Sequence, residues 1–194
     1  MVQLGPDGQA RLLNLLDPEL LPYTSFNGAV VPAYDEALVA TTPEPTDSRA
    51  VLAWVKEHTP DVFQGMPVGF YRTFLATVPL AAAGPDPTYV AGFDLEMWGV
   101  PTSTPKRDPN NHEFIYLRFQ RGIMMYDGAT GLTQGVLLGD MLRSIITGEG
   151  APYDLAASAA GGPLYRQYDP GRPLWLRDPS RLPGTDLTNA FARQ

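Results

Sequence analysis

Hydrophobic positions recur at helical spacing in four short segments, which are residues 9–16, 47–58, 67–78 and 137–147. Phe70 and Phe74, for example, are four residues apart and share one helix face. Asp47 or Ser48 can cap the start of the second segment, and Gly148 follows the fourth, where a helix commonly ends. The pattern therefore predicts four short helices.

Aromatic and β-branched residues favour strands between residues 114 and 136. We expect strands at 114–120, 123–126 and 132–136, with a bulge or kink at Arg121 and Gly122 and a glycine-bearing turn at 127–131. Residues 89–98 are apolar throughout and fit either a helix or a strand. Helices beside a small antiparallel sheet make the expected fold class α+β.

Proline divides the rest of the chain, which has 20 Pro and 19 Gly among its 194 residues. We expect one domain, with an irregular arm at 1–46, a helical and hairpin core at 47–148, and a proline- and aromatic-rich tail at 149–194. Aromatic residues are rare in solvated tails. The sequence therefore predicts that 163–194 covers the globule, with Tyr165, Tyr168, Trp175 and Leu176 buried against the helices at 67–78 and 137–147.

Charge, composition and the absence of certain motifs exclude several classes of protein. A formal net charge of −7 with two lysines lacks the basic footprint of a nucleic-acid-binding protein. No apolar run is long enough to span a bilayer. The absence of cysteine excludes disulfides and thiolate metal sites, and no phosphate-binding glycine motif is present. We therefore expect no cofactor.

The sequence from Trp98 to Val136 resembles a known repeat. Trp98-Gly99-Val100-Pro101-Thr102-Ser103 is followed by Phe119-Gln120-Arg121-Gly122-Ile123-Met124-Met125-Tyr126 and then by Ala129-Thr130-Gly131. This order is similar to the Leu-Gly-Phe-Pro repeat of secreted, cell-wall-associated bacterial proteins. Trp98 and Val100 replace the Leu and Phe of the signature, and a single copy is found. The resemblance implies a secreted or cell-surface location, with any leader removed, and a cell-wall glycan or other polysaccharide as partner.

One face of the first predicted strand has the chemistry for binding a sugar. Alternation places Tyr116, Arg118 and Gln120 on one side and the apolar residues on the other. Tyr stacks on a sugar ring, and Arg and Gln donate hydrogen bonds. With Trp98 and Tyr126, these residues form the candidate ligand-binding set. The alternative is an ordinary solvated strand face.

Paired carboxylates are the acid–base groups that this composition supplies. Asp94 and Glu96 share a face if their segment is a strand, and burial beside Trp98 would raise a carboxyl pKa, as in glycosidases. Asp127 is a second candidate base, and His112 beside Glu113 a weak base–orienter pair. We predict instead that Glu96 is mostly buried and paired with a basic group or a backbone donor, so that its role is structural.

Oxygen ligands gather in the loop at 108–113, where Asp108, Asn110 and Glu113 could contact Ca²⁺. Their spacing matches no known calcium loop, so an ordinary turn is the simpler interpretation and no metal site is expected.

These patterns lead to a non-catalytic secreted, envelope-associated or glycan-binding module as the expected function. The alternatives are a small carboxylate-dependent polysaccharide or peptidoglycan hydrolase and a structural or protein-interaction domain.

Overall fold

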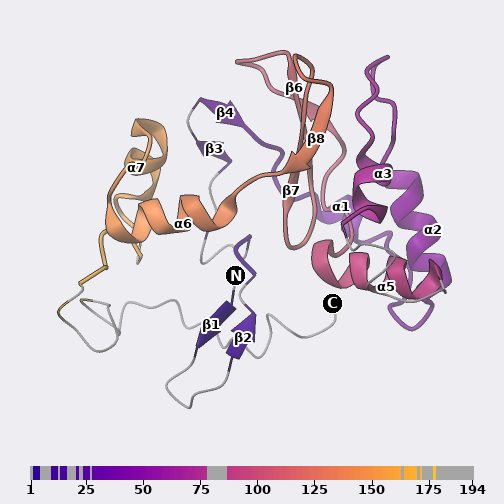
Figure 1. The fold of residues 1–194 in the computed structure, drawn as a ribbon, viewed down its shortest axis with the longest axis horizontal. Helices are drawn as coiled ribbons and strands as arrows, with labels where there is room; N and C mark the ends of the chain where they lie inside the picture. The colour runs from indigo at the N-terminus through magenta and orange to yellow at the C-terminus, as the bar shows by residue number, and fades with distance from the viewer. Residues whose placement is uncertain are drawn as a thin grey trace. The chain divides into compact units, whose positions relative to one another are not determined.

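The computed structural model describes residues 2–4, 10–12, 14–16, 21, 24–26, 28–77, 87–162, 164–169, 171 and 177. The fold class is α+β, as predicted (Figure 1). The chain forms two compact units, Met1–Gly28 with Leu137–Gln194, and Ala29–Val136. We call them the terminal unit and the central unit, because the first is made from the two ends of the sequence and the second is continuous between them.

The central unit is built on a four-stranded antiparallel sheet with the order β5 (Lys106–Arg107), β6 (Phe114–Arg118), β7 (Ile123–Asp127) and β8 (Leu132–Gly135). The predicted strands are thus present. The expected bulge is instead a tight turn between β6 and β7, because Arg118 pairs with Ile123 and the Phe119 N–H donates to the Gly122 carbonyl at 2.8 Å.

Four helices of this unit are α1 (Glu36–Val39), α2 (Ser48–His58), α3 (Phe70–Leu75) and α5 (Pro87–Trp98). Asp47 caps α2 by accepting from the Ala50 N–H at 2.9 Å, as predicted. Helix α3 is shorter than expected, because Gly69 has a left-handed backbone with φ of 58° and the helix begins after it. Residues 89–98 prove to be helical.

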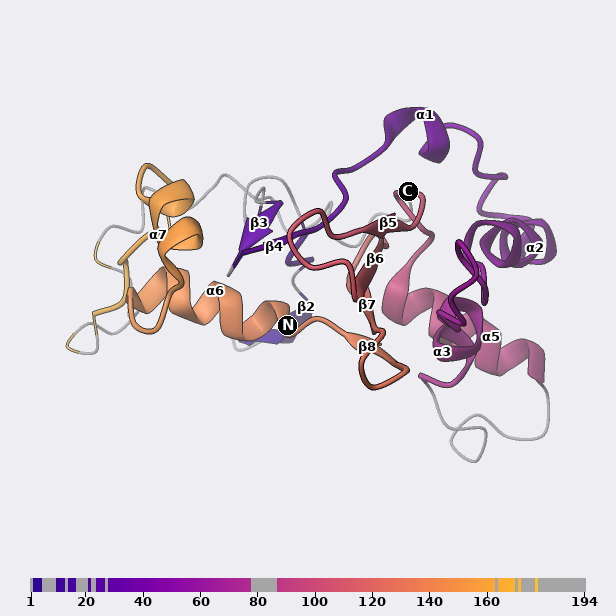
Figure 2. The same ribbon diagram turned by 90° about the horizontal axis from the view of Figure 1, so that it is seen from above.

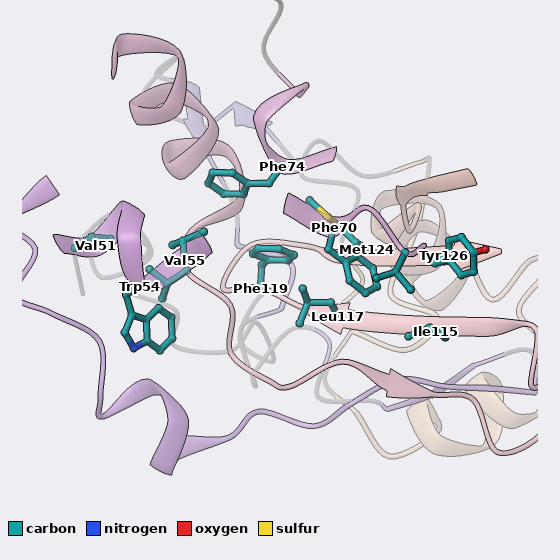
Figure 3. Packing of buried hydrophobic residues seen from close by; sticks show 12 residues of the cluster. Val51, Trp54, Val55, Phe70, Phe74, Ile115, Leu117, Phe119, Met124 and Tyr126 are labelled. Atoms are coloured by element: carbon teal, nitrogen blue, oxygen red, sulfur yellow. The ribbon is translucent and has the colours of Figure 1, made fainter. Parts of the chain in front are cut away.

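Helices α2 and α3 pack on one face of the sheet (Figure 2). Figure 3 shows Trp54 and Val55 of α2 and Phe70 and Phe74 of α3 gathered with the β6 and β7 side chains. The buried residues that β6, β7 and the turn between them contribute to this cluster are Ile115, Leu117, Phe119, Met124 and Tyr126. Alternate residues of β6 therefore point into the core, as the sequence pattern predicts.

The other face of β6 is covered as well. Residues 29–35, which we call the strap, include β4 (Ala29–Val30) and are tied at both ends. The Val30 N–H donates to Asp108 Oδ2 at 3.2 Å, and the Asp35 N–H donates to the Thr102 carbonyl at 2.8 Å. Between these bonds, Val31 is buried. The strap gives the central unit an additional buried layer that the pattern of β6 does not predict.

The terminal unit contains β1 (Val2–Leu4), β2 (Ala10–Leu12), β3 (Ser25–Phe26), α6 (Leu138–Thr147) and α7 (Tyr153–Ala159). Helix α6 and its left-handed Gly148 cap, with φ of 73°, are as predicted. The helix predicted at 9–16 is wrong. Residues 10–12 instead pair with β1, and this pairing satisfies their backbone groups without a helix.

Residues 166–168 of the tail lie beside the C-terminal end of α6. The Arg166 N–H donates to the Ile145 carbonyl, and the Tyr168 N–H donates to the Ile146 carbonyl, each at 2.9 Å. Leu164 is buried and Tyr165 is half-buried, whereas Tyr168 is exposed, contrary to prediction. Trp175 and Leu176 lie outside the described residues. The backbone of 166–168 is thus attached to α6, without the expected burial of Tyr168.

Candidate binding surface

The predicted sugar-binding face of β6 is not a surface. Tyr116 is 2% exposed and Arg118 is 6% exposed, so neither side chain is presented to solvent. Tyr126 is also buried, in the core cluster on the opposite face of the sheet. The expectation of an exposed polar face was wrong: both side chains are buried, and the strap, about 80 residues earlier in the chain, is bonded to Asp108, which acts on Tyr116.

Burial changes the acid–base properties of this face. It raises the pKa of Tyr116 to about 12, with a further contribution from the negative charge of Asp108. Burial also lowers the pKa of Arg118 from its ordinary value, while the phenol of Tyr34 in the strap acts in the opposite direction. These two dependences place Asp108 and Tyr34 close to the buried side of β6.

Trp98 and Gln120, the two other predicted ligand residues, have structural contacts. Trp98 is half-buried, its Nε1–H donates to Thr77 Oγ1 at 2.7 Å, and its ring lies 5.4 Å from that of Phe119. Gln120 Oε1 accepts from the Val100 N–H at 3.2 Å. Both side chains join the C-terminal end of α5 to neighbouring segments.

Helix α5 separates the two predicted catalytic carboxylates. Asp94 is fully buried and Glu96 is exposed, because residues two apart on a helix are about 200° apart around its axis. The expectation that Glu96 is buried and paired was therefore wrong. A pair of carboxylates on one strand face was the premise of the hydrolase alternative, and the helix removes it.

Of the two remaining candidates, Asp127 ends strand β7 and His112 lies in a turn. Asp127 Oδ1 accepts from the Ala129 N–H at 2.9 Å, and its Oδ2 accepts from Thr130 Oγ1 at 3.0 Å, so this carboxylate stabilises its own turn. His112 is exposed, and its carbonyl accepts a hydrogen bond from the Arg107 guanidinium. Neither arrangement shows a base oriented toward a nucleophile.

The 108–113 loop is held by its own side chains. Asp108 is buried, and it accepts from the Asn110 N–H at 2.8 Å as well as from the strap. Asn110 and Glu113 are exposed. Within the described ranges, no three His, Asp or Glu side chains are grouped closely enough to hold a metal ion. Asp108 acts here as a structural acceptor.

The exposed side of α5 is the surface that the sequence analysis missed. Phe93 is 50% exposed and Met97 is 59% exposed, and they lie one helical turn apart, with exposed Glu96 beside them. We call these three residues the α5 face. The helix buries an aspartate and exposes a phenylalanine and a methionine, which is the reverse of ordinary hydrophobic burial.

The α5 face is held in place at the C-terminal end of its helix. The Arg121 guanidinium donates to the Glu96 carbonyl at 2.7 Å and to the Leu95 carbonyl at 3.3 Å. A cation at these carbonyls complements the helix dipole. The Arg121 N–H also donates to the Trp98 carbonyl at 3.0 Å, so the β6–β7 turn is hydrogen-bonded to the C-terminal end of the helix. Rotation of α5 to bury Phe93 would break these contacts.

A sequence signal for this surface exists in hindsight. The segment is apolar on all sides, so no choice of helix face buries every large side chain at once. An apolar helix with a single acidic residue on each side indicates two contact surfaces, one inside the unit and one outside it. Without knowing that the segment is helical, this interpretation was not accessible.

No protein-family model matches the chain, and no curated protein or solved structure matches it either. The similarity of residues 98–136 to the Leu-Gly-Phe-Pro repeat therefore stays a prediction. No helix among the described residues has both the length and the apolar character needed to cross a membrane.

Proposed function

We propose that this protein is a non-catalytic binding module that contacts another protein through the α5 face. The observation that supports this proposal is the inverted burial of α5, with Asp94 inside and Phe93 and Met97 outside. Large exposed apolar side chains rimmed by a charge are typical of protein interaction sites. Phe and Met are also among the residue types enriched at such interfaces.

The charge of the chain indicates the chemistry of the partner. Glu96 is exposed beside Phe93 and Met97, and the whole chain has a formal net charge of −7. An apolar partner segment flanked by Lys or Arg is therefore complementary, and its association is accelerated by charge attraction. The flexible thioether of Met97 adapts to the shape of an apolar partner side chain.

The alternatives from the sequence keep weaker support. Glycan binding by an envelope-associated, secreted module stays a prediction, and with Tyr116, Arg118 and Tyr126 buried it would require other residues. The carboxylate hydrolase has weaker support because Asp94 is buried and Glu96 is exposed on the other side of the helix. Protein interaction is the interpretation with a described exposed surface behind it.

The test begins with a photo-reactive benzoylphenylalanine at position 93, cross-linked in an extract of the source organism. Each cross-linked protein is purified, and its affinity for the wild type, Phe93→Ala, Glu96→Lys and the control Val62→Gln is measured by calorimetry. Val62 is exposed between α2 and α3, outside the α5 face. Truncating a central apolar anchor costs more than about 1 kcal/mol, or roughly fivefold in affinity.

We expect Phe93→Ala to weaken binding at least fivefold, Glu96→Lys to weaken it most at low salt, and Val62→Gln to leave it unchanged. Equal affinities for the wild type and Phe93→Ala would contradict the proposal. Retention of the protein on insoluble cell-wall polysaccharide, with the same affinity in Phe93→Ala, would favour the glycan-binding alternative instead.

A further inference from the structure

The two edges of the central sheet differ in their protection against pairing with another strand. Edge strand β5 has two residues, Lys106 and Arg107, and lies between Pro105 and Pro109. Short length, positive charge and proline are the devices by which proteins block edge pairing. Edge strand β8 has the sequence Leu-Thr-Gln-Gly, without charge or proline, and most of it is exposed.

The hydrogen bonds of β8 show which backbone groups are directed outward. The Val136 N–H, just after the strand, donates to the Ile123 carbonyl of β7 at 2.8 Å. Ladder bonds in an antiparallel pair alternate along the strand, so Gln134 also bonds toward β7, and Thr133 and Gly135 direct their N–H and C=O groups away from it. Gly135 is exposed, and since glycine has only backbone atoms, its backbone is accessible.

We propose that β8 is a self-association edge, at which a second copy of this chain adds its own β8 in antiparallel orientation. Directly opposite residues in an antiparallel pair share a sheet face, so a twofold pair must centre on one residue that faces itself. With Gln134 at the centre, Thr133 faces Gly135 of the second copy. Thr133 and Gly135 are the residues whose backbone groups are directed outward. In this register, Thr133 and Gly135 of each copy are hydrogen-bonded to Gly135 and Thr133 of the other.

The side chains in this register are compatible with a second copy. Leu132, Gln134 and Val136 lie on the same face, so exposed Leu132 packs against Val136 of the other copy and the two Gln134 amides meet. No charge lies between Leu132 and Val136, so two chains of net charge −7 meet where neither carries charge. The product is a continuous sheet of eight strands with a small interface, typical of weak association.

Sedimentation equilibrium of the whole chain over a concentration series tests the proposal. We expect a monomer–dimer equilibrium with Kd on the order of 100 μM. Gln134→Lys and Gln134→Glu, each alone, place like charges opposite one another and weaken dimerisation at least tenfold. Because these two variants oppose Lys with Glu when mixed, the mixture regains the dimer. Thr104→Lys, an exposed control outside β8, leaves it unchanged.

A wild type that is monomeric at about 1 mM overturns the proposal. So does a dimer that survives in Gln134→Lys, because the edge would then not be the interface. Failure of the mixed charge variants to associate overturns the register centred on Gln134. Circular dichroism and melting temperature verify that each variant has the native fold, so that loss of dimer reports on the edge alone.

Discussion

Replacing Gly122 with Ala tests the contact that fixes Trp98 in the central unit. A Cβ atom at position 122 would lie 2.5 Å from Cζ3 and 2.7 Å from Cε3 of Trp98. The ring has little room to retreat, because its Nε1–H is bonded to Thr77 and its far edge lies against Gly135. The backbone of Gly122 does not have a positive φ, so the substitution adds a steric clash and no backbone strain.

Overpacking of this kind costs about 1–3 kcal/mol. We expect Gly122→Ala to lower the free energy of unfolding in urea by that amount, with an unchanged dependence on urea concentration. Gly92 provides the matched control, because it lies inside α5 and a Cβ added there would meet nothing within 4 Å. Gly92→Ala stabilises a helix interior by about 0.5–1 kcal/mol, so the two glycine substitutions have opposite signs.

A double-mutant cycle identifies Trp98 as the cause. In a Trp98→Leu background the ring atoms that meet the new methyl group are absent, so Gly122→Ala should cost close to nothing there. An equal cost in both backgrounds would refute the assignment of the clash to Trp98. A neutral Gly122→Ala in the wild-type background would refute the position of the ring itself.

Three further predictions concern single side chains. Because burial keeps Tyr116 protonated to about pH 12 while the unfolded phenol ionises near 10.0, the free energy of unfolding falls as pH rises between these values, and Tyr116→Phe removes this part of the fall in alkaline denaturation curves. Asp47→Ala removes the acceptor of the Ala50 N–H and should cost about 1 kcal/mol by urea denaturation, whereas Asp47→Ser should cost less. Asp108→Ala leaves the Val30 N–H without its acceptor and should cost about 1–3 kcal/mol, with faster amide exchange at Val30; unchanged exchange would contradict the role of Asp108.

The sequence predicts correctly those helices and strands whose ends are determined by neighbouring residues. Asp47 before α2 and Gly148 after α6 mark helix boundaries by direct backbone contacts, and both boundaries are where the sequence places them. The β6–β7–β8 meander was equally accessible, since its turns are short. These elements depend on residues within a few positions of one another.

The errors have causes that the spacing of apolar residues within one segment does not show. The leucine-rich segment near residue 12 pairs with β1 rather than forming a helix, and pairing partners cannot be read from helical spacing. Tyr116 and Arg118 alternate with apolar residues, which predicts solvent exposure until the strap is placed over them. The α5 face depends on a helix whose apolar surroundings fit a strand equally well. In the first two cases, contacts with another segment of the chain decided the outcome.

The strap also sets an order of events during synthesis. The hydrogen bond from the Val30 N–H to Asp108 cannot form until Asp108 is synthesised, because Asp108 is 78 residues further along the chain. At about 5–20 residues per second, roughly 4–16 s of translation separate the two. The β6–β7 hairpin closes locally and fast, whereas the strap must close a long loop. During refolding of the full chain, we therefore expect pulse-labelled amides of β6 and β7 to gain protection before Val30, with the Arg118 side of the sheet open until the strap packs on it.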